Sequence, residues 1–313
     1  MKRFCKLILL LLVLVPQACR ESSPKRVERP FPNVSVPGVM SGQQQAASYL
    51  ASHYWDCFLS PSGGPWISDS MHVAGVRADV LYHAVRDYAV CLGLAPDARE
   101  ALSALPGKIA GFQAADSLCN VYPRLTDMLR ECLYDPNSDL RDEDLYGALA
   151  ASLATSELTP DNMRASYRFE ASMCALNSKG SPAADFHFKD ARGRDHRLYD
   201  YRTPFTLVLF VNPGCHACEE TVELFGGDNA RALVGAGTLT IISVYIDEDL
   251  DEWRAKVSQM PDFWVNGYDP DLIVRRDVIY NVRAIPSVYL LDSSHTVLLK
   301  DAVPGVAATA LGI

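Results

Sequence analysis

Two cysteines separated by two residues carry the clearest chemical signal in this sequence of 313 residues. They lie in the segment Cys215-His216-Ala217-Cys218, and this spacing on a helix brings both sulphur atoms to one face, within reach of a disulfide. A helix N-terminus favours a thiolate on the first cysteine, which attacks a disulfide before the second cysteine resolves the mixed intermediate. The spacing therefore predicts thiol–disulfide exchange, with Cys215 as the attacking thiol and Cys218 as the resolving thiol.

Two other interpretations of the cysteine pair stay open. Half of a zinc site would use the same residues, but the sequence has no second Cys-x-x-Cys segment and no His-x-x-x-His segment to complete it. A purely structural disulfide is the other alternative, although such a bridge would close a small loop and constrain the chain little. The pattern calls for no metal and no cofactor.

The segments around the pair predict how the sulphur atoms are positioned. Phe205 to Val211 is a continuous apolar run, as expected of a strand buried on both faces, and Pro213-Gly214 turns the chain into a helix from Ala217 to Phe225. The other expected elements are hairpins at 185–198 and 287–299, a strand at 239–246, and helices at 229–234, 250–259 and 270–280. Strands alternating with helices predict an α/β domain at 181–313, a central mixed sheet flanked by helices.

The chain before this region has a helical pattern. Apolar residues recur at three- and four-residue spacing, which predicts helices at 47–58, 80–92, 98–112, 118–133, 144–153 and 163–176. A loop-forming segment follows at Asn177 to Pro182. We therefore predict an all-α domain at 42–178, followed by the α/β domain.

The first residues have the features of an export signal. Lys2, Arg3 and Lys6 precede an apolar run at 7–15, which is shorter than the roughly 20 residues that span a bilayer. Ala18-Cys19 then resembles the site at which bacterial lipoproteins are cleaved and lipidated, so we expect a signal peptide at 1–18, a lipid on Cys19 and a proline-rich linker at 19–41. This places the protein on a bacterial envelope membrane, facing the periplasm. The alternative is an ordinary secretory signal with an incidental cysteine.

The overall composition sets limits on partners. A formal net charge of -9 disfavours a nucleic-acid partner held through phosphate neutralisation. Nine cysteines are present, and those at 57, 91, 119, 132 and 174 have no paired spacing. An odd number in an exported protein predicts at least one buried free thiol.

A proline at the start of an apolar strand completes a wider pattern. Together with the cysteine segment, Ile285-Pro286 resembles the thioredoxin superfamily, and most closely its membrane-tethered TlpA/ResA-like branch, over residues 181–313. The resemblance implies a cis Ile285-Pro286 bond and backbone hydrogen bonds from Ile285 to a substrate chain. It also implies disulfide-bearing envelope proteins or small thiols as substrates, and a separate redox donor. The segments at 49–56 and 134–138 resemble a helical domain of unassigned function that precedes such domains in envelope lipoproteins.

Two positions depart from the family pattern. Thioredoxins carry a buried acid six residues before the first cysteine, where this chain has Leu209, and the TlpA/ResA-like branch often has a glutamate six residues after it, where this chain has Thr221. His216 and Glu220 are candidates for tuning the thiolate, or are simply exposed residues at a helix start. We expect the dithiol chemistry to be kept and rapid turnover to suffer.

The leading hypothesis is an envelope lipoprotein that reduces disulfides. An oxidase or isomerase would use the same residues, because direction depends on the reduction potential. The alternative from another class is a redox-inactive binding lipoprotein whose helical half recognises a protein or a glycan.

Overall fold

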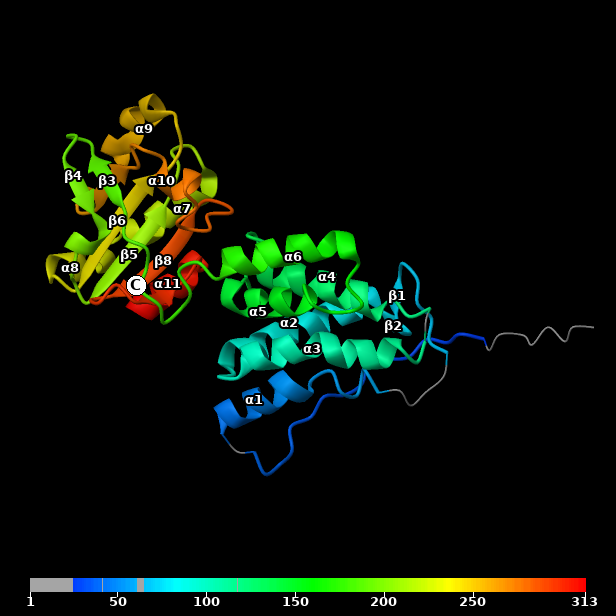
Figure 1. The fold of residues 1–313 in the computed structure, drawn as a ribbon. Coiled ribbons are helices and arrows are strands. Elements are labelled where there is room, and N and C mark those ends of the chain that lie inside the picture. Colours follow the sequence, from blue (N-terminus) through cyan, green and yellow to red (C-terminus); the bar gives the residue numbers. More distant parts are fainter. Residues whose placement is uncertain (1–24, 41, 61–64, 117) are drawn as a thin grey trace, which may run out of the picture.

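The computed structural model describes residues 25–40, 42–60, 65–116 and 118–313. The expected signal peptide and Cys19 lie outside these residues. Helices make up the first half of the chain, and a sheet with flanking helices makes up the second (Figure 1). This confirms the predicted fold class, an all-α region followed by an α/β thioredoxin-like domain. In the part of the chain that the structure describes, no helix is both long and apolar enough to cross a membrane.

The helical half packs around one apolar core. Its described residues form α1 (Gln43–His53), α2 (Ala78–Leu94), α3 (Ala98–Gln113), α4 (Val121–Tyr134), α5 (Glu143–Leu153) and α6 (Asp161–Cys174). Buried aromatic side chains, including Trp55 and Tyr88, fill the centre of this core. One feature was not predicted: a short antiparallel hairpin of β1 (His72–Val73) and β2 (Val76–Arg77) precedes α2.

The second half is built on a sheet whose strand order is β4-β3-β7-β6-β5-β8-β9. The strands are β3 (His187–Asp190), β4 (Asp195–Arg197), β5 (Phe205–Phe210), β6 (Leu239–Tyr245), β7 (Val265–Tyr268), β8 (Ser287–Asp292) and β9 (Val297–Leu299). Strands β5, β6 and β7 are parallel, and the other neighbours are antiparallel. Alternation along β5 sends Val208 into one apolar cluster and Leu209 into the other, so this strand is buried on both faces.

Five α-helices flank this sheet within residues 181–313. They are α7 (His216–Gly226), α8 (Asp228–Gly235), α9 (Leu250–Lys256), α10 (Ile273–Arg276) and α11 (Pro304–Leu311). The helix predicted at 270–280 is wrong in length, because α10 is a single turn between Leu272 and Val278, which both adopt positive φ angles. Strand β7 and helix α11 were not predicted.

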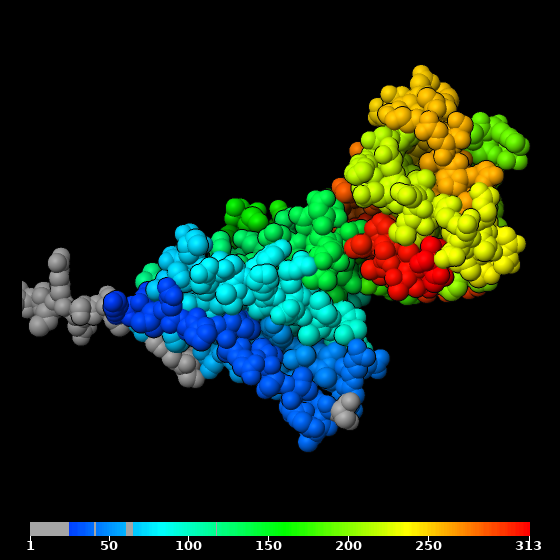
Figure 2. Space-filling model, turned by 180° about the vertical axis from the view of Figure 1, so that it is seen from behind, coloured from blue at the N-terminus to red at the C-terminus, as the bar shows by residue number. Residues whose placement is uncertain are grey.

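The two halves lie end to end. Figure 2 shows the second half, in yellow to red, at one end of the helical half, while the first described residues emerge near the opposite end. The turn between α4 and α5 and the C-terminal end of α6 lie on the side that faces the sheet domain, because Arg141, Glu143 and Cys174 all contact it. The helical half therefore approaches the sheet domain through a few defined loops and helix ends.

Candidate redox site

The cysteine pair lies where strand β5 gives way to helix α7. The strand ends at Phe210, and Gly214 adopts a φ of 81°, a left-handed conformation that favours glycine and turns the chain. Cys215 then occupies the N-cap position of α7, and its carbonyl accepts a hydrogen bond of 3.0 Å from Glu219 N. The structure thus has the strand, turn and helix that the sequence predicted around the pair.

The two thiols have different surroundings. Cys215 is half-buried, whereas Cys218, one turn later, is only 2% exposed. Burial, reinforced by a hydrogen bond with the Cys215 sulphur, raises the pKa of Cys218 to about 12. No disulfide joins them in the structure. The arrangement presents one sulphur to an incoming disulfide and keeps the other protonated behind it.

The loop that ends in Ile285-Pro286 faces Cys215. Its peptide bond is cis, which confirms what the resemblance implied. The loop reaches this place because β8 pairs antiparallel with β5, with Ser287 opposite Phe210. The Cys215 thiol donates a hydrogen bond of 3.7 Å to the Ile285 carbonyl. The two segments that were predicted separately therefore meet at one sulphur atom.

The two positions at which the family carries an acid are both buried here, one on β5 and one on α7. Leu209 is fully buried in the same apolar cluster as Cys218, and Thr221 is 2% exposed. The Thr221 hydroxyl donates to the Ala217 carbonyl at 2.8 Å, within its own helix. Neither side chain can accept a proton from the Cys218 thiol as a carboxylate would.

His216 and Glu220 lie on the exposed face of α7. The His216 side chain is 87% exposed, and its Nε2 lies 3.4 Å from Glu220 Oε1 and its Nδ1 4.0 Å from Glu219 Oε2. The described ionic contacts of the imidazole are thus with carboxylates. The negative charge of these carboxylates opposes stabilisation of a nearby thiolate by the ring.

Sequence reasoning missed the residues behind the pair. A cavity of about 250 Å³ borders Cys218 and is lined by Ser243, Trp253 and Lys256 among others. Lys256 Nζ comes so close to the turn that it would lie 2.9 Å from a Cβ added to Gly214. No local pattern links this lysine to the cysteines, because α9 reaches the turn only through the tertiary fold.

Five other cysteines in the described residues are free. Cys119, Cys132 and Cys174 are buried, Cys91 is half-buried and Cys57 is exposed. Burial raises the pKa of Cys132 to about 11 and that of Cys174 to about 12. These buried thiols are protonated and enclosed at neutral pH, so Cys215 differs from them in both position and access.

Comparisons with known proteins cover both halves of the chain. A family model described as a domain of unknown function, DUF5106, matches residues 16–177. A crystal structure of a thioredoxin-like protein from Bacteroides caccae is 30% identical, covers 90% of this chain and 98% of that chain, and has a TM-score of 0.76.

Two further solved structures each cover less than half of this chain. One is the C-terminal domain of an uncharacterized protein from Bacteroides fragilis, 37% identical over 44% of this chain and 99% of that chain, with a TM-score of 0.42. The other is the thioredoxin domain of a thiol-disulfide oxidoreductase from Bacteroides vulgatus, 24% identical over 42% of this chain and 97% of that chain, with a TM-score of 0.36. A search of curated proteins found no match.

Proposed function

Because the chain belongs to the DUF5106 family and to the thioredoxin-like proteins, we propose that it is a thiol–disulfide oxidoreductase of the TlpA/ResA-like type. One observation carries the proposal: the accessible Cys215 thiol contacts the Ile285 carbonyl, while Cys218 is buried one helical turn away. A structural disulfide would not require one sulphur to stay accessible beside a cis-proline loop.

The reaction uses two exchange steps. The Cys215 thiolate attacks one sulphur of a substrate disulfide, which forms a mixed disulfide and releases the first substrate thiolate. Cys218 then gives up its proton and attacks the Cys215 sulphur, which releases the second substrate thiolate and leaves a Cys215–Cys218 disulfide. Two electrons pass from the dithiol to the substrate, so a thiol donor must reduce the pair again. An oxidase would run the same steps in reverse.

Proton transfer from Cys218 is the slow point of this scheme. The thiol has a pKa of about 12, and Leu209 and Thr221 supply no carboxylate to accept its proton. Resolution therefore depends on another base: water, the released substrate thiolate, or the carboxylates of Glu219 and Glu223, which line the cavity beside Cys218. This favours a slow, durable mixed disulfide over rapid turnover.

The cellular setting is part of the proposal. We place the protein on the bacterial envelope through a lipid on Cys19, facing the periplasm, with disulfide-bearing envelope proteins or small thiols as substrates. The support is the sequence of residues 1–23. A mass spectrum of the mature N-terminal peptide tests it, since a diacylglyceryl group on Cys19 is the expected result and cleavage without a lipid would contradict it.

Mixed-disulfide trapping tests the activity. In a Cys218→Ala variant the second step is blocked, so substrates stay attached to Cys215 and are released by dithiothreitol. We expect envelope proteins in the trapped fraction, and none with the matched Cys215→Ser, Cys218→Ala double variant. Partners retained equally by both variants would support instead the redox-inactive binding lipoprotein.

A further inference from the structure

The loop between α4 and α5 lies beside the cis-proline loop. A groove of about 370 Å³ separates them, with Pro136 and Asn137 of the helical half on one side and Leu224, Ile285 and Pro286 of the sheet domain on the other. The segment Tyr134-Asp135-Pro136-Asn137-Ser138 has no part in the dithiol chemistry described above. Its place in the fold gives it a different role, because it forms one wall of this groove.

The groove is continuous with the redox site. Ile285 lines the groove and also accepts the hydrogen bond from the Cys215 thiol. Ala217, which lies between the two cysteines in the sequence, lines the same groove. When the disulfide of a substrate reaches Cys215, the part of the substrate next to the sulphur therefore lies at the mouth of the groove.

The wall supplied by the helical half is held firmly. Within the loop, Asp135 Oδ1 accepts a hydrogen bond of 2.8 Å from Asn137 N, and Ser138 N donates to the Asp135 carbonyl at 3.0 Å. At its end, Arg141 donates 2.9 Å hydrogen bonds to the carbonyls of Asp301 and Ala302 in the sheet domain. The wall is thus fixed relative to the opposite side of the groove.

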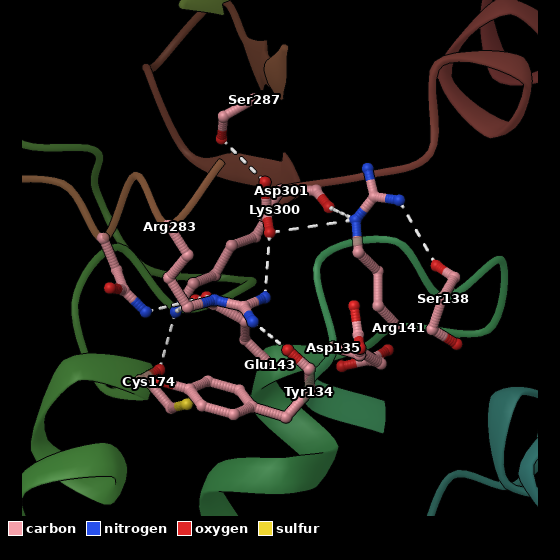
Figure 3. A network of polar contacts seen from close by, with 12 residues as sticks. Tyr134, Asp135, Ser138, Arg141, Glu143, Cys174, Arg283, Ser287, Lys300 and Asp301 are labelled. Carbon is pink, nitrogen blue, oxygen red and sulfur yellow. Dashed lines mark hydrogen bonds and ion pairs between the residues drawn. The ribbon is translucent and has the colours of Figure 1, made fainter. Parts of the chain in front are cut away.

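The opposite side is anchored to the same helices. Figure 3 shows Arg283, two residues before Ile285, with its guanidinium between Tyr134, Glu143 and Asp301. The guanidinium lies 4.1 Å above the Tyr134 ring and donates to the Tyr134 carbonyl and to Glu143. Both sides of the groove are therefore fastened to the start of α5 and the end of α4, and the gap between them has a defined width.

We propose that this groove binds an extended polypeptide segment next to the substrate cysteine, so that the helical half selects protein disulfides over small ones. The inference rests on the proposed function. Prolines and Leu224 give the apolar contacts that an extended chain uses, and Asn137 and Glu220 offer acceptors for its backbone amides. A small disulfide ends at the sulphur atoms and gains nothing from a wall built by another domain.

A bulky residue in the groove tests the selection. Asn137 is exposed, so Asn137→Trp adds a side chain in the groove without disturbing a core. The pre-reduced protein is mixed with bovine insulin or with bis(2-hydroxyethyl) disulfide, and formation of the Cys215–Cys218 disulfide is followed by peptide mapping. We expect reaction with insulin to slow about tenfold, as for loss of one central contact, and reaction with the small disulfide to be unchanged. The matched control is Gln44→Trp on the exposed surface of α1, which should alter neither rate.

The outcomes separate the inference from the function that it rests on. The proposed function fails if the wild-type protein reacts with insulin and with the small disulfide no faster than a Cys215→Ser protein does. If wild type reacts with both, but Asn137→Trp slows both equally or slows neither, the function stands and the groove is not a polypeptide site. Circular dichroism and tryptophan fluorescence spectra that match wild type show that the variant is folded.

Discussion

Arg283 Nε of the sheet domain donates a hydrogen bond of 2.6 Å to Glu143 Oε1 of the helical half. Both side chains are almost enclosed, with 12% and 1% of their surfaces exposed. Lys300, also 1% exposed, lies 3.1 Å from the other oxygen of the same carboxylate. Burial raises the pKa of Glu143, and the two cations oppose that rise. Glu143 is thus shared by two buried cations of the neighbouring domain, and Asp301 is a second partner of Arg283 at 3.1 Å.

Glu143→Ala should strongly destabilise the protein. The substitution leaves Arg283 and Lys300 buried without their shared anion, which costs about 3–5 kcal/mol in comparable sites. Urea unfolding followed by tryptophan fluorescence measures the free energy of unfolding. The matched control is Asp251→Ala, which removes the exposed partner of Arg254 and should change stability little. Equal effects of the two substitutions would mean that the network contributes no more than a surface ion pair.

The two active-site thiols should differ sharply toward alkylation. Because the pKa of Cys218 is about 12, its thiolate is scarce at pH 8 and the sulphur is enclosed, so iodoacetamide should modify Cys215 and spare Cys218. Modification of Cys218 should rise only as the pH climbs toward that value. Peptide mapping separates these sites from the exposed Cys57, and the same reaction in urea should label every thiol. Equal labelling of the native pair at pH 8 would contradict this assignment.

An acid at position 221 should speed the second step. Thr221 is buried on α7 three residues after Cys218, so Thr221→Glu brings a carboxylate to the same helix face. With that base available, release of the second substrate thiol at pH 7 should accelerate about a hundredfold. Thr221→Gln has nearly the same shape but no basic carboxylate, and it should give no acceleration. A gain with both variants would point to altered packing, and a gain with neither would show that proton transfer does not limit resolution.

Gly214 should matter for chemistry beyond its effect on stability. An alanine at its φ of 81° costs about 1–2 kcal/mol, and Gly193→Ala, at a φ of 74°, should cost a similar amount. The neighbours differ, since an added Cβ at Gly214 meets Lys256 Nζ at 2.9 Å, while nothing lies within 4 Å at Gly193. Only Gly214→Ala should therefore change the rate at which iodoacetamide modifies Cys215. A similar change in both variants would show that the substitutions act by loosening the fold in general.

Local patterns predicted the fold class and the strand, turn and helix around the cysteine pair. The apolar run of β5, the Pro213-Gly214 turn and the helical spacing of the cysteines are encoded within a dozen or so neighbouring residues. Strand β7 escaped prediction because it is short and contains Gly267, which approaches the Phe188 ring closely. The helix predicted at 270–280 was too long, because apolar spacing does not reveal the left-handed conformations of Leu272 and Val278.

The groove and the network beneath it could not be predicted from the sequence. Glu143 and Asp144 look like ordinary acidic residues at a helix start, and they do lie in the first turn of α5. Arg283 looks like an exposed residue before a proline. Their burial comes from the contact of two domains, and one sequence offers no signal that pairs residues so far apart.

The charges at this contact also limit how the two halves can be recombined. Arg141 and Glu143 come from one domain, and Arg283, Lys300 and Asp301 come from the other. Each domain therefore has charged side chains at the contact that need partners from the other domain. A chimera joining halves from two relatives would work only if both sets matched. This contact therefore favours exchanging the helical and thioredoxin-like domains together over exchanging either one alone.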